Sequence, residues 1–505
     1  MNNPSIPSIP FYKLLYTSRE NKRLYWFAGI VIVIQFVWFK MDCFYPNIIP
    51  DTYSYVLGAY NNDFIHIRPI GYSKFLRFFS VFTRSHLLLV LSQYLLLQAG
   101  VLYFFFTLRY LLNPGKWVLR VLLAFTLLNP LLVKVSNFIT SDALFTSLSL
   151  VWFTQLLWLL YIPSRKLLLA HAVVLLLAFS VRYNALYYPF ISVTCIIIAQ
   201  LRLKTKLIAI VGMAIPLFVF IVATEYEYKK TTGATQFSAF GGWQLAINGL
   251  HAYAHDPLVP VASVPAPFRA LHAIVNRHMD SLNHLRYRPD AVLGVYYLSD
   301  TKSPLNIYFF GDTSSPSIRG YENRWLRMGP LYGEYGTYLI KQHRNAYFQH
   351  FLLPNLGNYM EPPSEMMGYY QLNKATLFPL FVNWFRFPSN KLYTYFEDPR
   401  IRVINVLPRL FAIVNLFFVL TAMGFIIWCG PVKPKELAHR ILLITVLCWL
   451  SNFVFSVSAS VIVLRYQIFP FIMVYSFGVL LAVLLWQKLY GLLNLSGSAS
   501  PVSIH

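Results

Sequence analysis

Charged residues are scarce in this chain, and acidic ones are the scarcest. Of its 505 residues, 12% are charged and 57% are hydrophobic, whereas about a quarter of the residues of a soluble protein are charged. Asp and Glu number 19 against 42 Lys and Arg, which gives a formal net charge of +23. This composition excludes an ordinary soluble protein and indicates that most of the chain lies in lipid.

Cysteine is also rare, with four residues in the chain. Cys195 and Cys448 fall inside apolar segments and Cys429 falls at the end of one, which leaves Cys43 as the single external thiol. One external thiol excludes an internal disulfide. Because Cys and His do not recur at the spacing of metal ligands either, we expect no structural zinc site.

Long hydrophobic runs, by contrast, recur along the chain. A helix of about 20 apolar residues crosses the ~30 Å hydrocarbon core of a bilayer. We predict about ten such helices, and their recurrence excludes a signal peptide followed by a soluble body. The predicted segments are 24–41, 86–110, 118–136, 142–161, 166–181, 185–201, 207–224, 405–428, 440–463 and 466–487.

The basic residues indicate how these helices are oriented. If the N-terminus is cytoplasmic, sixteen Lys and Arg fall in cytoplasmic segments, against only Glu20 and Glu436. Short cytoplasmic loops rich in Lys and Arg fix the orientation of membrane proteins. The charge therefore predicts a multi-pass protein of the inner (plasma) membrane with both termini cytoplasmic, and it gives no sign of a nucleic-acid partner. The sixteen residues are Lys13, Arg19, Lys22, Arg23, Arg109, Lys116, Arg120, Arg165, Lys166, Arg202, Lys204, Lys206, Lys433, Lys435, Arg440 and Lys488.

Two polar segments fall on the opposite, extracytoplasmic side. The first external loop, 42–85, is too long for a simple turn, and its second half has the spacing of an interfacial helix. The four aromatic residues expected on one face of that helix are Tyr72, Phe75, Phe78 and Phe79. The second segment, 225–402, is large enough to fold as an α or α+β domain.

The predicted fold class is therefore an all-α polytopic membrane protein with an extracytoplasmic insert. A seven-helix module, 1–224, precedes the insert, and three transmembrane helices, 403–490, follow it. Within the insert, the stretch that begins at Leu331 is typical of a helix resting against the membrane. The tail, 491–505, is expected to be disordered.

Several ionisable residues break the charge pattern. Three of the rare acids, Asp42, Asp51 and Asp142, fall at the outer ends of the predicted helices. Each has an ordinary explanation alone, since Asp51 and Asp142 could cap helix N-termini and the arginines could contact lipid headgroups. Together they indicate one site, because charges near the membrane are costly unless they are paired. The cations at the same ends are Arg68, Lys74, Arg77, Arg84, Lys134, Arg182 and Arg465.

One or two acids beside several arginines suit the transfer of a sugar from a lipid phosphate. The acceptor hydroxyl needs a carboxylate that takes its proton as the new bond forms. The departing phosphate is a good leaving group, and cations stabilise its charge. One general base and a few guanidinium groups would therefore suffice.

The motifs around these residues occur in a recognisable order. They are PDTYSYV with Asp51, IRPIGYSKFL with Arg68, SDALF with Asp142, VRYNALYYP with Arg182, and LRYQIFP with Arg465. In this the chain resembles the GT-C class of polyprenyl-phosphate-sugar-dependent glycosyltransferases, especially bacterial members similar to protein O-mannosyltransferases and aminoarabinose lipid A transferases. The resemblance covers residues 1–224 and touches the C-terminal end. It implies a GT-C-like fold, a polyprenyl-phosphate-sugar donor, and a lipid, glycan or protein acceptor.

The resemblance also implies roles for the matching residues. Asp51 corresponds to the catalytic base and Asp142 to the acid that organises the site. Arg68 would face the donor phosphate, while Arg182 and Arg465 would contact donor phosphate or acceptor. Further candidates for substrate binding lie in or beside these motifs and in the insert turn LLPNLGNYMEPP, which should approach the membrane. They are His66, Tyr55, Tyr183, Tyr466, Asn355 and Tyr359.

The chain departs from the family pattern in two respects. Many members have two adjacent acids in the first loop, whereas Thr52 follows Asp51 here, so a second carboxylate would have to be Asp142, Asp42 or Asp63, or be absent. The insert matches no domain of the family. A divalent cation would fit if Asp51 and Asp142 met, but no cofactor is required because the arginines supply positive charge.

Two other functions compete with a transferase. A transporter or flippase for a polar lipid would also place charges between helices, but usually near the bilayer midplane and within paired repeats. A non-catalytic protein of envelope glycan assembly would use the aromatic insert for binding. Retained function after Asp51→Asn would favour either alternative.

Overall fold

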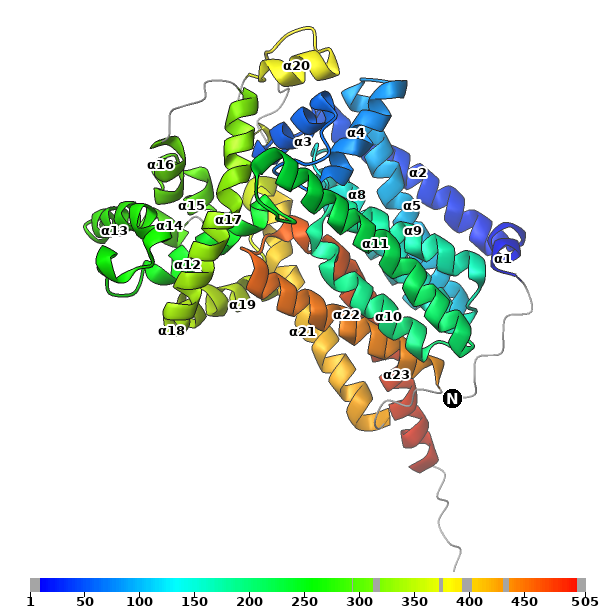
Figure 1. The fold of residues 1–505 in the computed structure, drawn as a ribbon. Coiled ribbons are helices and arrows are strands. Elements are labelled where there is room, and N and C mark those ends of the chain that lie inside the picture. Colours follow the sequence, from blue (N-terminus) through cyan, green and yellow to red (C-terminus); the bar gives the residue numbers. More distant parts are fainter. Residues whose placement is uncertain are drawn as a thin grey trace, which may run out of the picture.

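The computed structural model describes residues 10–292, 294–311, 318–371, 376–392, 402–429 and 436–496. Within these ranges the regular structure is helical, and the only β-type pairings are two isolated bridges, Asn47–Phe138 and Thr376–Lys391. Figure 1 shows long helices running side by side, with the shorter helices of the insert gathered at one end. The predicted all-α, multi-pass fold is confirmed.

Eight helical segments among the described residues are long and apolar enough to cross a membrane. The two other predicted segments are a 17-residue helix, α9 (Arg165–Val181), and the shorter pair η1 (Tyr183–Tyr187) and α10 (Tyr188–Ile198). The long segments are α2 (Arg19–Asp42), α5 (His86–Leu112), α6 with α7 (Lys116–Ser136), α8 (Asp142–Tyr161), α11 (Leu203–Thr232), α21 (Arg402–Cys429), α22 (Leu437–Ala459) and α23 (Ile468–Ser496).

The short helix α10 belongs to the bundle despite its length. Trp152 of α8 is fully buried and stacks on Tyr188 of α10, with ring centroids 3.8 Å apart. The indole Nε1 of Trp152 also donates to Ser192 Oγ at 3.0 Å. Hydrogen bonds of this kind link helices inside a membrane, where backbone and side-chain polar groups have no water to bind.

The predicted helix 118–136 is broken into α6 (Lys116–Leu127) and α7 (Pro130–Ser136). Pro130 begins the second helix, and the side chain of Asn129 accepts a hydrogen bond from Leu131 N at 3.0 Å. An Asn N-cap followed by Pro starts a new helix, because Pro lacks the N–H that would continue the old one. The prediction of one continuous helix was wrong at this point.

The first external loop forms α3 (Pro50–Asn61) and α4 (Ile70–Phe82). The expected helix is present, but its buried face holds Tyr72, Ser73 and Leu76, whereas Phe78 is 65% exposed. The aromatic face that the sequence indicated is therefore divided between protein contacts and the surface. Packed against α3 is α20 (Pro379–Phe385), through Phe381 and Trp384.

The core of the insert is the helix pair α12 (Ala239–Tyr253) and α17 (Ile318–Gln342). Trp243 of α12 and Tyr332 and Tyr335 of α17 are fully buried in this pair. The stretch from Leu331, expected to rest on the membrane, therefore faces the interior of the insert instead, because its aromatic side chains are covered by α12.

Short helices complete the insert and connect it to the bundle. Of these, α19 packs against α22, and η7 lies in the turn between α22 and α23. The predicted disordered tail begins inside α23, which continues to Ser496; residues 497–505 lie outside the described ranges. The remaining elements are α1 (Phe11–Thr17), η2 (Val261–Ser263), η3 (Ala266–Phe268), α13 (Arg269–Asn283), α14 (Pro289–Val292), α15 (Tyr296–Ser299), α16 (Pro304–Gly311), α18 (Arg344–Tyr347), η4 (Phe348–Leu352), α19 (Leu353–Met360), η5 (Glu365–Gly368) and η7 (Leu464–Tyr466).

Candidate active site

Two acidic residues meet at the end of the bundle that faces the insert. Asp51 lies in the first turn of α3, and Asp142 is the first residue of α8. Neither is the N-cap, since Ile49 and Ser141 hold those positions. Both carboxylates nevertheless lie at helix N-termini, where the helix dipole favours negative charge.

The loops that precede α3 and α8 are hydrogen-bonded to each other. Asn47 N donates to Asn137 O at 2.7 Å, and Ile139 N donates to Asn47 O at 3.3 Å. The side chain of Asn137 adds a bond from its Nδ2 to Tyr45 O at 3.1 Å and accepts one from Lys40 Nζ at 3.0 Å. These bonds bring the two helix starts together, although they are about ninety residues apart in sequence.

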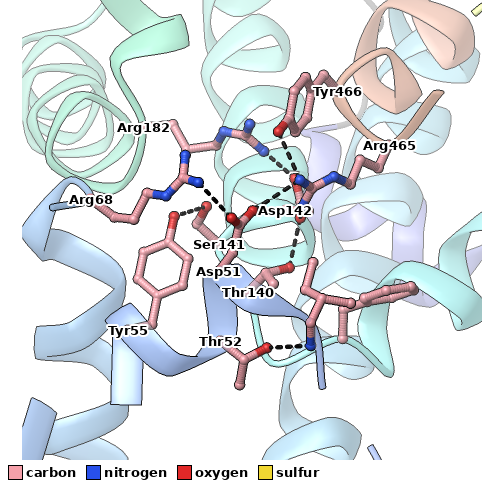
Figure 2. Close-up of polar contacts among 12 residues, drawn as sticks. Asp51, Thr52, Tyr55, Arg68, Thr140, Ser141, Asp142, Arg182, Arg465 and Tyr466 are labelled. Carbon is pink, nitrogen blue, oxygen red and sulfur yellow. Dashed lines mark hydrogen bonds and ion pairs between the residues drawn. The ribbon is translucent and has the colours of Figure 1, made fainter. Parts of the chain in front are cut away.

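Three guanidinium groups hold the two carboxylates (Figure 2). Arg68 Nη2 donates to Asp51 Oδ1 at 2.6 Å, and Arg465 Nη2 donates to Asp51 Oδ2 at 2.9 Å. Arg465 Nη1 also donates to Asp142 Oδ2 at 3.2 Å, and Arg182 Nη1 donates to Asp142 Oδ1. Arg465 therefore bridges the two acids. Three cations against two anions leave an excess of one positive charge in the cluster.

Aromatic rings support the arginines. The guanidinium carbon of Arg68 lies 4.1 Å from the ring centroid of Phe240, on α12 of the insert. That of Arg182 lies 4.2 Å from the ring of Tyr466, whose hydroxyl accepts a bond from Arg465 Nη2 at 2.8 Å. Arginine stacked on a ring face is fixed in position and keeps its edge N–H groups for hydrogen bonding.

One N–H of this cluster has no partner among the described residues. Arg68 Nε is buried and has no hydrogen-bond partner among the described residues. A buried donor without a partner is uncommon in native proteins and costs free energy. An anion bound beside Arg68 would satisfy this donor.

A cavity of about 340 Å³ opens beside the cluster, between the bundle and the insert. Its volume falls within the range of pockets that hold small molecules. The bundle and first-loop side of its wall includes Asp51, Arg68, Arg182 and Arg465. The insert contributes Phe240, Gln244, Ile247, Leu298, Ser299 and Trp325, and η5 contributes Glu365.

Two carboxyl groups of this wall have opposite pKa shifts. Burial alone would raise the pKa of Asp51, but the charges of Arg68 and Arg465 outweigh burial and lower that pKa to about 2. Burial raises the pKa of Glu365, against the opposing charge of Arg465. The two carboxyl groups of the wall thus have different pKa values, which is a usual arrangement for acid–base chemistry.

The structure brings together most of the residues predicted for the site. Seven line the cavity and Asp142 lies directly behind them, where its carboxylate also accepts a bond from Thr140 Oγ1 at 2.6 Å. The hydroxyl of Tyr55 shares a 2.8 Å hydrogen bond with Ser141 Oγ. The seven are Asp51, Tyr55, Arg68, Arg182, Tyr183, Arg465 and Tyr466.

Three predicted substrate contacts lie elsewhere. Asn355 Nδ2 donates to Val457 O and Ser460 O at 3.1 and 3.2 Å, and Tyr359 Oη donates to Asn452 Oδ1 at 3.0 Å. These bonds fix α19 to α22, so the turn does approach the bundle, but both side chains are buried in that contact. His66 faces a different cavity, beside Glu322.

Glu365 is the acid of the cavity wall that sequence reasoning missed. It lies in a Pro-, Met- and Tyr-rich stretch of the insert, and its φ of 40° is in the left-handed region, which is unusual for a residue other than glycine. Leu464 N donates to Pro363 O at 2.9 Å, which brings this stretch to the turn that carries Arg465. No local motif signals the contact, because it joins residues about a hundred positions apart.

The arrangement suits an anion better than a metal ion. Each oxygen of Asp51 and Asp142 already accepts a bond from a guanidinium group. A divalent cation between the two acids would lie against three positive charges. The cluster thus offers an anion one unpartnered guanidinium N–H, an excess of positive charge, and a carboxylate within reach.

No family model matches the sequence, and no curated protein matches it. Among solved structures, the chain is similar to the crystal structure of ArnT from Cupriavidus metallidurans bound to undecaprenyl phosphate. The match has 11% sequence identity and a TM-score of 0.29, and it covers 91% of this chain and 78% of that one.

Proposed function

We propose that this protein transfers a glycosyl group from a polyprenyl-phosphate-linked donor to a hydroxyl group of a lipid, glycan or protein acceptor, on the extracytoplasmic face of the membrane. The observation that supports this proposal is the cluster of Arg68, Arg182 and Arg465 around Asp51 and Asp142, at the wall of a cavity. The cluster lies at the end of an apolar bundle, where a lipid anion can present its phosphate while its chain stays in the bilayer.

Each step of the reaction has a candidate group in the cavity. The acceptor oxygen attacks the anomeric carbon and forms the new C–O bond, while the bond from that carbon to the phosphate oxygen breaks and its electron pair leaves with the phosphate. Arg68, Arg182 and Arg465 stabilise the charge that develops on the phosphate. Asp51 takes the proton of the acceptor hydroxyl.

Donor binding is expected to make Asp51 a better base. With two guanidinium groups on its carboxylate, Asp51 has a pKa of about 2 and little tendency to accept a proton. A phosphate that enters the cavity competes for the N–H groups of Arg68 and Arg465. As those bonds move to the phosphate, the pKa of Asp51 rises toward its ordinary value, so the base becomes effective only when donor is present.

Glu365 is a second candidate for the base. It lines the same cavity, and burial raises its pKa, which makes it the stronger base of the two before donor binds. If Asp51 is the base, Asp51→Asn should lose activity, and if Glu365 is the base, Glu365→Gln should lose it.

The test is glycosyl transfer by the purified protein in lipid nanodiscs, with polyprenyl-phosphate-linked sugars as donors and release of polyprenyl phosphate as the readout. We expect Asp51→Asn to lower the rate by about 10²–10⁴, the usual contribution of a general base. Asp256→Asn is the matched control, since this acid of the insert pairs with His343 and neither residue lines the cavity. A large loss in Glu365→Gln with little change in Asp51→Asn would move the base to Glu365.

A transporter is distinguished from a transferase by whether the bond between the sugar and the lipid phosphate breaks. If the protein moves intact sugar-linked lipid across proteoliposomes and releases no polyprenyl phosphate, the transferase proposal is wrong. Full transfer activity in both Asp51→Asn and Glu365→Gln would also contradict it, because no other described acid lines the cavity.

A further inference from the structure

A second polar cluster lies on the other side of the loop that carries Arg68. Asp63, His66 and Glu322 each offer one ligand atom, and these atoms all lie within 4.8 Å of one another. His66 Nε2 is 2.8 Å from Glu322 Oε1, and both residues are buried, at 5% and 8% exposed. Glu322 and His66 are buried and Asp63 is half-buried, so the carboxylate of Glu322 in particular needs a charged or hydrogen-bonding partner in the interior.

Two further observations point to an occupant. His66 Nδ1 is buried and has no hydrogen-bond partner among the described residues. The cluster also borders a cavity of about 230 Å³ that is lined by Asp63, His66 and Glu322, with Glu227 of α11 on the same wall. Lys74 places a positive charge near Asp63, whereas the partner that the structure gives Glu322 is His66.

We propose that Asp63, His66 and Glu322 bind one divalent transition-metal ion of the zinc or manganese class. Imidazole nitrogen with carboxylate oxygen is a ligand set that such ions favour, whereas Ca²⁺ takes six to eight oxygen ligands. His66 would offer the ion one unprotonated ring nitrogen, and Glu227 or water completes the coordination. Ligand atoms bound to one zinc ion lie about 2.0–2.2 Å from it, so small closures of these side chains would complete the site.

The position of the ion indicates what it does. Asp63 and His66 belong to the loop between α3 and α4, whereas Glu322 belongs to α17 of the insert. The backbone of the loop is also held there, because Tyr228 Oη donates to His66 O at 2.9 Å. His66 is two residues before Arg68. The ion therefore joins the insert to the loop that presents Arg68 to Asp51, as a positioning element.

The test measures metal directly. The purified full-length protein in nanodiscs is incubated with Zn²⁺ or Mn²⁺, freed of loose metal by dialysis, and assayed for bound metal by mass spectrometry. Its melting temperature is also compared with and without a chelator. We expect wild type to hold stoichiometric metal and to melt at a lower temperature after chelation. His66→Gln and Glu322→Gln should lose the bound metal and the response to chelator.

His343→Gln is the matched control. His343 Nδ1 pairs with Asp256 Oδ2 at 2.6 Å, but this pair has no third ligand among the described residues, so the variant should hold metal as wild type does. If His66→Gln fails to fold, Asp63→Asn, which alters the least buried ligand, replaces it. Equal metal content in wild type and ligand variants, or a wild-type melting temperature that chelator does not move, would overturn the proposal.

Metal binding does not depend on the proposed function, although the effect of the ion on transfer does. Asp51→Asn should bind metal like wild type, because Asp51 shares no contact with the cluster. If neither wild type nor any variant transfers sugar, while wild type holds metal and the ligand variants lose it, the proposed function is wrong and the metal site stands. If transfer follows the expected pattern but wild type and the ligand variants hold the same amount of metal, the metal site is wrong and the proposed function stands.

Discussion

At the scale of single residues, Arg465 connects the two acids of the cavity. Its two terminal nitrogens donate to different carboxylates, 2.9 Å to Asp51 and 3.2 Å to Asp142. A guanidinium group has a planar fork of donors that can serve two carboxylates at once, whereas an ammonium group is a single point charge. Without this bridge, two carboxylates at neighbouring helix N-termini would repel each other.

Arg465→Lys should therefore lower the rate of glycosyl transfer even though the charge is kept. The single nitrogen of lysine cannot take the positions of both terminal nitrogens of Arg465, so we expect the loss of one bond, and a charge-assisted hydrogen bond contributes about 1.5–3 kcal/mol. At 1.4 kcal/mol per tenfold change, the expected loss is roughly 10- to 100-fold. The measurement is release of polyprenyl phosphate, together with the melting temperature of each variant.

Arg77→Lys is the control for this substitution, since Arg77 is exposed on α4. A wild-type rate in a folded Arg465→Lys protein would show that the bridge between the acids has no role in transfer.

The sequence contained enough information to predict the charged residues of the site except Glu365. Asp51, Arg68, Asp142, Arg182 and Arg465 were detectable because charged residues at the ends of apolar segments are costly and therefore rare. In the polar insert a single acid is ordinary, so Glu365 had no such contrast. Its position follows from tertiary contacts with the turn that carries Arg465.

At the scale of elements, the insert depends on the close approach of α12 and α17. A Cβ atom on Gly336 would collide with the backbone of Leu245, and one on Gly242 would collide with the carbonyl of Gly329. These neighbours are backbone atoms, which cannot move aside without separating the helices. Small residues allow helices to pack at short distance, as in membrane helix pairs.

Gly336→Ala should destabilise the insert. The added methyl group separates the pair and disturbs the packing of Trp243 against Tyr332, so we expect the free energy of unfolding to fall by about 1–3 kcal/mol, the usual cost of overpacking. The melting temperature of the purified protein measures it.

Gly357→Ala in α19 is the opposite case, because nothing lies within 4 Å of the position where its Cβ atom would be. Ala has the higher helix propensity, so this variant should melt at the same temperature as wild type or above it. Equal melting temperatures for wild type and Gly336→Ala would show that the two helices can separate without cost.

Helix positions were largely predictable, whereas the surroundings of each helix were not. Hydrophobic runs located the long helices, because about 20 apolar residues have few other stable conformations in a bilayer. The break at Asn129 and Pro130 carried a local signal, N-cap followed by Pro, that hydropathy does not weigh. The burial of α17 carried none, since an aromatic helix face fits equally well against lipid or against another helix.

At the scale of the whole molecule, the cavity is formed by parts that are far apart in sequence. The first loop supplies Asp51 and Arg68, the turn after α22 supplies Arg465, and α12 supplies Phe240. The insert thereby covers the end of the bundle, as Figure 1 shows. Sequence patterns predict that these parts lie on one side of the membrane, but only the tertiary fold shows that they line one cavity.

The expectation that all these parts lie on one side of the membrane leads to a prediction about the topology of the chain. Arg109 of α5 pairs with Glu20 of α2 at 2.8 Å, at the ends of these helices opposite to the cavity, and this is the end where the basic loops cluster. The excess of Lys and Arg in these loops predicts that this end is cytoplasmic and that the insert is extracytoplasmic. In a Cys429→Ser background, Lys116→Cys marks the basic end and Ser281→Cys marks the insert, and both positions are exposed. The remaining cysteines, Cys43, Cys195 and Cys448, are buried.

A membrane-impermeant maleimide applied to intact spheroplasts should label Ser281→Cys at once and Lys116→Cys only after the membrane is permeabilised. The site would then face the compartment in which envelope lipids and glycans serve as acceptors, while the loops that fix the orientation remain in the cytoplasm. The reverse labelling pattern would place the cavity in the cytoplasm, where the charge distribution would have no explanation and an extracytoplasmic transferase would be excluded.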